Sequence, residues 1–139
     1  MGRELIVAIC LDDGGGMLFG GQRQSRDRVL TAELCASTNG KIYITSFSSA
    51  IFKEHRERVE IVDDPFNDAP DGATLFIENI DISPYEDRVA EILLYKWNRK
   101  YPADKWIDID LSSYRIISKR IFVGSSHDKI TRLKLKRET

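Results

Sequence analysis

Apolar positions in the first half of the chain follow two spacings, one typical of strands and one typical of helices. The segment 4–11 is almost continuously apolar and rich in β-branched residues, which predicts a strand buried on both faces. Shorter apolar segments at 41–45, 59–62 and 74–77 also predict strands.

Two helices are predicted between these strands. The first has Ser25 as its expected N-cap and Gly40 as its stop, with apolar residues at helical spacing (Val29, Leu30, Leu34 and Cys35). The second carries apolar residues at 50–52 and has Ser46 or Ser48 as its cap. The alternation of strand and helix predicts an α/β fold with a largely parallel central sheet flanked by helices.

The last part of the chain changes character. Segment 89–97 reads as another buried strand, and the segments 114–122 and 130–136 alternate apolar and polar residues. A turn by composition, 124–129, separates the last two. We expect an antiparallel pair that closes one edge of the sheet, where Lys134 and Lys136 would discourage edge-to-edge pairing.

Composition and charge set the outer limits. A chain of 139 residues is the size of a single domain, so we expect one domain spanning 1–139. The net charge of -1 provides no general attraction to nucleic acid. The first ten residues lack the apolar core of a signal peptide, and no apolar run reaches the roughly 20 residues of a membrane helix. The expectation is a cytoplasmic protein without a membrane partner, and the pattern predicts no particular oligomeric state.

Several segments resemble the dihydrofolate reductase family over nearly the whole chain. LIVAICLDD is similar to the family's first strand and mobile loop, and NGKIYITSFSSAIF to its second strand and the helix behind it. LFIENI stands where the family has an Ile-Gly-Gly turn, and ILLYKW, YPADKW and DIDLSSYRIIS resemble its later strand, acidic loop and closing hairpin. The resemblance implies a mixed, largely parallel sheet with an antiparallel C-terminal hairpin, and NADPH and folate as the family's ligands.

The residues at the family's cofactor positions differ. A glycine pair lets the dinucleotide approach the backbone in the family, whereas Glu78 and Asn79 match those positions here. Glu78 adds bulk and a negative charge beside a would-be pyrophosphate. Ser46 stands where the family has a phosphate-facing arginine. Ser48 stands near the family's threonine, although it could equally be a plain N-cap. Ordinary NADPH binding is therefore not expected.

The family's pterin-binding carboxylate has no clear counterpart. The corresponding stretch reads GQRQSRDRV, in which Asp27 is the only acid, yet counting back from the second strand places Val29 or Leu30 at the acid's position. Two roles for Asp27 stay open. It is either a catalytic acid brought into place by a loop shift, or a first-turn carboxylate favoured by the helix dipole.

Three polar clusters are expected beyond the carboxyl ends of the parallel strands, where open α/β sheets bind ligands. The candidate ligand-binding residues are Arg23, Gln24, Ser25, Arg26, Ser46, Ser48, Glu78, Asn79, Trp97 and Lys105. Arginines donate to phosphate or carboxylate, and aromatic rings can stack on a ligand ring. This combination predicts a small anionic or aromatic ligand. The alternative is that the aromatic residues belong to the core and the arginines to the solvated surface.

Neither histidine lies in a metal motif. His127, in the predicted turn, is a candidate proton shuttle if it faces the pocket, the alternative being a solvated residue or a local cap. His55 lies in a charged run typical of a surface. An RNA-processing enzyme of the ribonuclease Z type needs a His-x-His-x-Asp-His cluster to hold two zinc ions, and the chain has no such cluster.

The sequence favours one hypothesis and leaves two alternatives. The favoured one is a dihydrofolate-reductase-like protein that has lost normal NADPH and folate recognition, and that acts as a small-ligand-binding protein or pseudoenzyme without an assigned cofactor. One alternative is a divergent NADPH-dependent reductase in which Asp27 or His127 handles protons. The other is an RNA-binding or RNA-processing protein, which the lack of overall basic charge disfavours.

Overall fold

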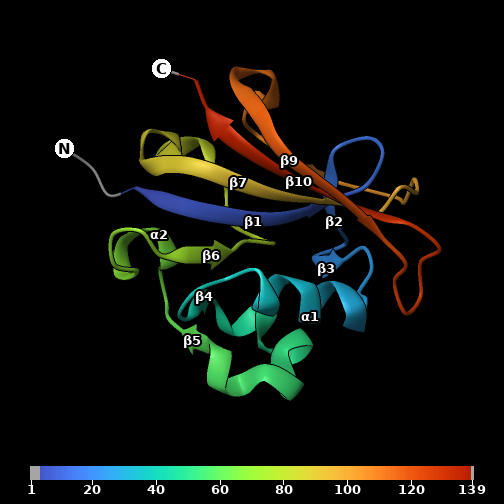
Figure 1. Ribbon diagram of the computed structural model, residues 1–139, viewed down its shortest axis with the longest axis horizontal. Helices are drawn as coiled ribbons and strands as arrows, with labels where there is room; N and C mark the ends of the chain where they lie inside the picture. The colour runs from blue at the N-terminus through green and yellow to red at the C-terminus, as the bar shows by residue number, and fades with distance from the viewer. Residues whose placement is uncertain (1–3, 139) are drawn as a thin grey trace.

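The computed structural model describes residues 4–138 and places a seven-stranded sheet at the centre of the molecule (Figure 1). In spatial order the strands are β5 (Val59–Ile61), β4 (Ile42–Ile44), β6 (Thr74–Phe76), β1 (Leu5–Leu11), β7 (Val89–Lys96), β10 (Ile130–Arg137) and β9 (Tyr114–Phe122). The pairs β4·β5, β4·β6, β1·β6 and β1·β7 are parallel, whereas β10 is antiparallel to both β7 and β9. The predicted mixed sheet with a C-terminal hairpin is confirmed.

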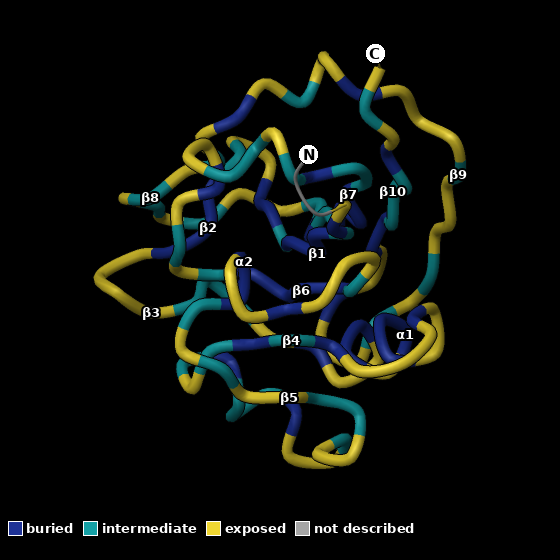
Figure 2. The backbone as a smooth tube through the Cα atoms, turned by 90° about the vertical axis from the view of Figure 1, so that its left-hand side faces the viewer, coloured by how far each residue is buried: buried dark blue, intermediate teal, exposed yellow. Residues whose placement is uncertain are grey.

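The edge of the sheet differs from the prediction in one respect. β10, which carries Lys134 and Lys136, lies between β7 and β9, so these lysines do not protect an edge. At this end of the sheet the edge strand is β9, and Figure 2 shows most of its length exposed. Arg115, Lys119 and Arg120 on β9 provide the edge charges instead.

Helical segments cover the two faces of the sheet unequally. On one face, α1 (Arg28–Ala36) and the 3-10 helix η1 (Ser46–Arg58) pack over a core that includes Leu34, Phe52 and Tyr95. On the other face the shorter α2 (Pro65–Asp68), η2 (Ser83–Arg88) and η3 (Leu111–Ser113) accompany a second core around Leu75 and Ile92.

Successive residues of β1 and β7 supply the two cores in turn, because side chains alternate across a strand. Val7 and Ile9 contribute to one core and Ala8 to the other. The continuous apolar pattern of the first predicted strand is explained by this double burial.

The polar region after β1 forms a small antiparallel sheet that was not predicted. β2 (Gly16–Phe19) pairs with β3 (Gln22–Arg23) and with β8 (Lys105–Trp106). Through this small sheet, β3 and the residues after it lie on the same side of the molecule as the loop that follows β7. Arg23 and its neighbours are therefore at the carboxyl ends of the parallel strands. Within residues 4–138 no helix has the length and apolar character needed to cross a membrane.

Candidate functional site

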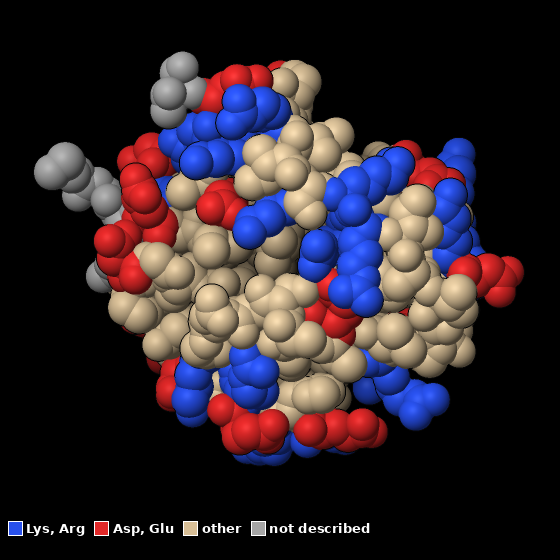
Figure 3. Space-filling model, in the orientation of Figure 1, with Lys and Arg blue, Asp and Glu red and all other residues tan. Residues whose placement is uncertain are grey.

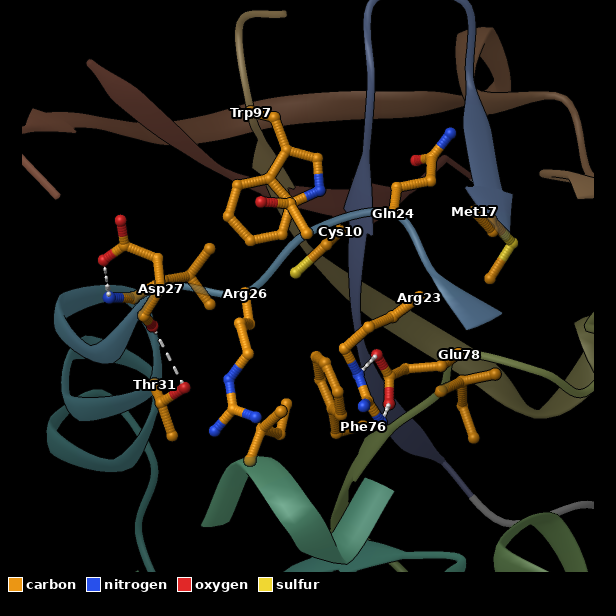
Figure 4. A pocket seen from close by; sticks show the side chains of 14 residues that line it. Cys10, Met17, Arg23, Gln24, Arg26, Asp27, Thr31, Phe76, Glu78 and Trp97 are labelled. Carbon is orange, nitrogen blue, oxygen red and sulfur yellow. Dashed lines mark hydrogen bonds and ion pairs between the residues drawn. The ribbon is translucent and has the colours of Figure 1, made fainter. Parts of the chain in front are cut away.

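A small cavity lies at the carboxyl ends of β1, β6 and β7 (Figure 4). Its walls come from β1 (Cys10), the end of β6 (Phe76 to Glu78), the residue after β7 (Trp97), α1 and η1, and from residues 23–27. Its volume is only about 20 Å³. Because one water molecule needs roughly 10–15 Å³ by this kind of measure, the cavity has room for about one water.

An ion pair between Arg23 and Glu78 lines this cavity. Glu78 accepts two hydrogen bonds from Arg23, one from Nε and one from a terminal nitrogen, each 2.9 Å long. The two side chains are 10% and 17% exposed respectively. The same guanidinium donates to the carbonyl of Phe47 at 2.8 Å and lies 4.8 Å from the centre of its ring. Figure 4 shows the pair at the centre of the cavity wall.

Ser48 also belongs to this group of contacts, and its role differs from the helix cap that was expected. The N-cap of η1 is Thr45, which makes no side-chain capping bond, so neither Ser46 nor Ser48 caps the helix. Instead the Ser48 hydroxyl donates to Glu78 at 2.7 Å. The ion pair therefore ties together β3, the end of β6 and the first turn of η1.

Asp27, and not the predicted Ser25, is the N-cap of α1. One carboxylate oxygen accepts from the backbone N–H groups of Val29 and Leu30 at 2.9 and 3.2 Å. The carboxylate also accepts from the backbone N–H groups of Ser125 and Ser126 in the turn between β9 and β10. Burial alone would raise the pKa of Asp27, but these bonds and that of His127 outweigh it and hold the pKa well below its usual range.

His127 is buried against Asp27 and is not a solvated turn residue. Its Nδ1 lies 3.0 Å from an Asp27 oxygen, and both side chains are almost wholly removed from solvent. The ring stacks on Trp97 with centroids 4.5 Å apart. The two residues that the sequence singled out as candidates for proton chemistry are thus direct partners.

Tyr101 and Ser25 share the other ring nitrogen of His127. Nε2 lies 2.9 Å from the Tyr101 hydroxyl and 3.2 Å from the Ser25 hydroxyl. Asp12 fixes this loop because its carboxylate accepts from the Tyr101 backbone N–H at 3.0 Å. Sequence reasoning missed Asp12, although an acid directly after a buried strand is a signal that could have found it.

The remaining predicted residues are divided between the cavity and the surface. Gln24 lines the cavity and donates to Asp12 and to the carbonyl of Pro102. Arg26 lines it too, and Figure 4 shows its side chain extending toward η1. Ser46 and Asn79 are exposed and not among the lining residues, and Lys105 pairs with Asp81 outside the cavity.

Metal ligands are not gathered anywhere in the described part of the chain. Residues 4–138 contain no group of three or more His, Cys, Asp or Glu side chains arranged to hold an ion. Cys10 and Cys35 are both free thiols, and burial raises the pKa of each.

Comparison with known proteins gives a fold. No protein-family model matches the chain, and no curated protein sequence matches it. A search of solved structures finds dihydrofolate reductase from Enterococcus faecalis, solved in complex with NADP(H) and the compound RAB-propyl, with a TM-score of 0.66. The likeness covers 98% of this chain and 97% of that one at 10% sequence identity. The chain therefore has a dihydrofolate-reductase-like fold.

Proposed function

We propose that this protein is a dihydrofolate-reductase-like binding protein that does not hold NADPH or folate in the manner of that family. The bidentate ion pair between Arg23 and Glu78 is the observation that carries the proposal. It occupies the end of β6, where the family resemblance places a glycine pair and the dinucleotide.

The residues present do not fit a dinucleotide at this place. Glu78 turns a carboxylate toward the cavity, where Arg23 and Ser48 donate to it, and the carbonyl of Phe47 in turn accepts from Arg23. A pyrophosphate placed beside it would meet a like charge in a partly buried setting, which is strongly unfavourable. Opening the space would break four hydrogen bonds that also join three elements.

The folate position is equally altered. A pterin-binding carboxylate needs free oxygens that face the ligand. Both oxygens of Asp27 are engaged by the helix N-terminus, the hairpin turn and His127. Figure 4 shows the Asp27 carboxylate turned away from Arg23 and Glu78. Neither of the family's ligands is therefore supported by the geometry.

A hollow beside the cavity supports a small anionic ligand instead. It lies between α1 and η1, measures about 130 Å³, and adjoins the cavity through Arg26, Thr31 and Ile51. Three cations line it, Arg26, Arg28 and Lys53, together with His55 and a single acid, Glu54. No ion pair within residues 4–138 involves these three cations.

The size and charge of the hollow define the ligand class. Pockets for drug-sized molecules measure roughly 300–1,000 Å³, so a volume near 130 Å³ suits a phosphate, a pyrophosphate or a small carboxylate. Two arginines offer paired donors that match such groups. The aromatic half of the predicted ligand has no comparable support, because Trp97 is buried and one of its faces stacks on His127.

Isothermal titration with inorganic pyrophosphate tests this proposal. We expect saturable binding to the unmodified protein and at least a tenfold weaker affinity for the double variant Arg26→Gln/Arg28→Gln, since each charged hydrogen bond contributes about 1.5–3 kcal/mol. Arg56→Gln is the control for charge, because Arg56 lies on η1 but does not line this hollow. No saturable heat with the unmodified protein, or equal binding by the double variant, would contradict the proposal.

A further inference from the structure

Three side chains form a hydrogen-bonded series that the binding role does not use. Ser25 Oγ lies 3.2 Å from His127 Nε2, and His127 Nδ1 lies 3.0 Å from Asp27 Oδ2. The order is hydroxyl, imidazole, carboxylate. It is the order in which serine hydrolases arrange their nucleophile, their base and the group that orients the base.

The hydrogen bonds fix the protonation pattern of the series. An ionised carboxylate can only accept, so the proton between Asp27 and His127 resides on Nδ1 of the ring. In the neutral form of the ring, the lone pair of Nε2 is then directed at the hydroxyls of Ser25 and Tyr101. Four backbone N–H groups keep Asp27 ionised and in place, and Asp27 in turn fixes the orientation of the imidazole.

The base and its orienting carboxylate are buried, whereas the hydroxyl is partly exposed, which is the arrangement that catalysis requires. The side chains of Asp27 and His127 are 0% and 1% exposed, and Trp97 covers a face of the ring. Ser25 is only partly buried, and the next residue, Arg26, lines both the cavity and the larger hollow between α1 and η1. We propose that Ser25, His127 and Asp27 form a nucleophilic site that hydrolyses small carboxylic esters through an acyl-serine. The ester enters from the side of that hollow, because the cavity itself has room for only about one water.

Each step of this reaction balances with water as the second reactant. The Ser25 oxygen attacks the ester carbonyl while its proton passes to His127 Nε2. The tetrahedral intermediate then expels the alcohol, which takes that proton. Water attacks the acyl-serine, gives a proton to His127, and releases the carboxylic acid as Ser25 recovers its proton. Ser25 and His127 are the catalytic residues, and Asp27 is a positioning residue.

Tyr101 competes with Ser25 for the base. The tyrosine hydroxyl is the closer of the two to Nε2, at 2.9 Å against 3.2 Å, and one lone pair serves both. Removing the tyrosine hydroxyl should therefore direct the lone pair to Ser25 alone. This gives the proposal a variant that is expected to gain reactivity, which a purely structural network does not predict.

The test is labelling of the folded protein with an alkyl fluorophosphonate, followed by mass spectrometry of its peptides. We expect one adduct per chain at Ser25, lost on unfolding in urea and absent from Ser25→Ala. Labelling should be about 100-fold slower or more in His127→Gln and faster in Tyr101→Phe. Ser49→Ala is the control, because the Ser49 hydroxyl donates to the Ser46 carbonyl, and this variant should label at the unmodified rate.

Several results would overturn the proposal. They are no adduct at Ser25 of the folded protein at pH 8, the same rate in His127→Gln, or the same rate in unfolded chains. If His127→Gln fails to fold, Tyr101→Phe decides, and an unchanged or slower rate in that variant counts against the proposal.

A substrate preference connects this site to the hollow lined by Arg26, Arg28 and Lys53, which we call the anion hollow. This part of the inference rests on the proposed function. Arg26 follows Ser25 in the chain and lines both spaces. Release of p-nitrophenol should be faster from mono-p-nitrophenyl succinate than from p-nitrophenyl acetate, and Arg26→Gln should remove the difference. Fluorophosphonate labelling without this preference would refute the anion hollow as part of the ester site and leave the nucleophilic site standing.

Discussion

At the scale of single residues, two carboxylates stand at the ends of elements around the candidate site. Glu78 stands at the end of β6 and binds Arg23, whereas Asp27 stands at the start of α1 and binds the β9–β10 turn. Both side chains are almost buried, and both accept several hydrogen bonds. They hold neighbouring segments together, and Asp27 in addition orients a histidine.

The charge of Asp27 should appear in the pH dependence of stability. Its pKa is lowered in the folded protein, so its contribution is complete above the ordinary value near 4 and is lost as the pH falls below that value. Asp27→Asn should lower the free energy of unfolding by about 2 kcal/mol at pH 7. Urea denaturation from pH 7 to pH 2.5 should show this difference shrinking below about pH 4.

A variant at an exposed acid provides the comparison. Asp13→Asn lies in the turn after β1, where the side chain is exposed, and should change stability little at any pH. Parallel curves for the unmodified protein and Asp27→Asn across the whole range would show that Asp27 carries no special charge effect.

Sequence reasoning reached these residues unevenly. Glu78 was recognisable because a charged residue ends an apolar strand where a glycine was expected. Its partner was not, since Arg23 is separated from it by 55 positions and only the fold brings them together. The same holds for Asp27 and His127, which are 100 positions apart. The N-cap was misassigned because Ser25 and Asp27 are both good capping residues.

At the scale of elements, the β9–β10 turn fits against the start of α1 through a glycine. A Cβ atom built on Gly124 would lie 2.8 Å from Asp27 Cγ and 2.8 Å from a methyl group of Ile130. These distances are too short for any side chain, so the approach of the turn to Asp27 requires glycine at this position.

Gly124→Ala should therefore destabilise the protein through steric overlap. We expect a loss of about 1–3 kcal/mol in the free energy of unfolding, typical of overpacking, measured by urea denaturation. Gly14→Ala is the matched control, because its Cβ would meet nothing closer than an Asp12 oxygen at 3.6 Å. Equal stability of the two variants would mean that the turn adapts and does not hold Asp27 by close packing.

The boundaries of the elements show which strands and helices the spacing of apolar residues can predict and which it cannot. Long apolar strands such as β1 and β7 were predicted within a residue of their ends, because double burial leaves a clear pattern. The sheet of β2, β3 and β8 was missed because its strands have only two to four residues. η1 was predicted as a short helix, yet it runs for 13 residues with non-helical breaks at Phe52 and His55.

At the scale of the whole molecule, charge is distributed very unevenly. Residues 114–138 contain eight Lys or Arg and two Asp or Glu, a charge of +6, so the rest of the chain carries -7 within a total of -1. Figure 3 shows basic side chains over the upper half of this face, where Figure 1 draws β9 and β10, with others along the lower edge. This hairpin is a feature that favours the RNA-binding alternative. It offers few aromatic faces for base stacking, because Tyr114 is buried and Phe122 is partly buried.

The fold as a whole was predictable and the activity was not, for a physical reason. Many residues along each strand of the main sheet carry the same apolar pattern, so the prediction of the sheet does not depend on any single residue. The site depends on a few contacts, each made once, between segments distant in the sequence. Arg23 with Glu78, and Ser25 with His127, are contacts of this kind.

We propose that the Arg23–Glu78 ion pair occupies the place of the family's cofactor, and a fluorescence titration with NADPH tests this. The nicotinamide emission reports burial of the ring, and excess pyrophosphate is present to compete for the hollow lined by Arg26, Arg28 and Lys53. The enterococcal reductase serves as the positive control. We expect no saturable change for this protein. A saturable change that persists in pyrophosphate would show that the nicotinamide enters the fold despite Glu78, and that the ion pair does not exclude the cofactor.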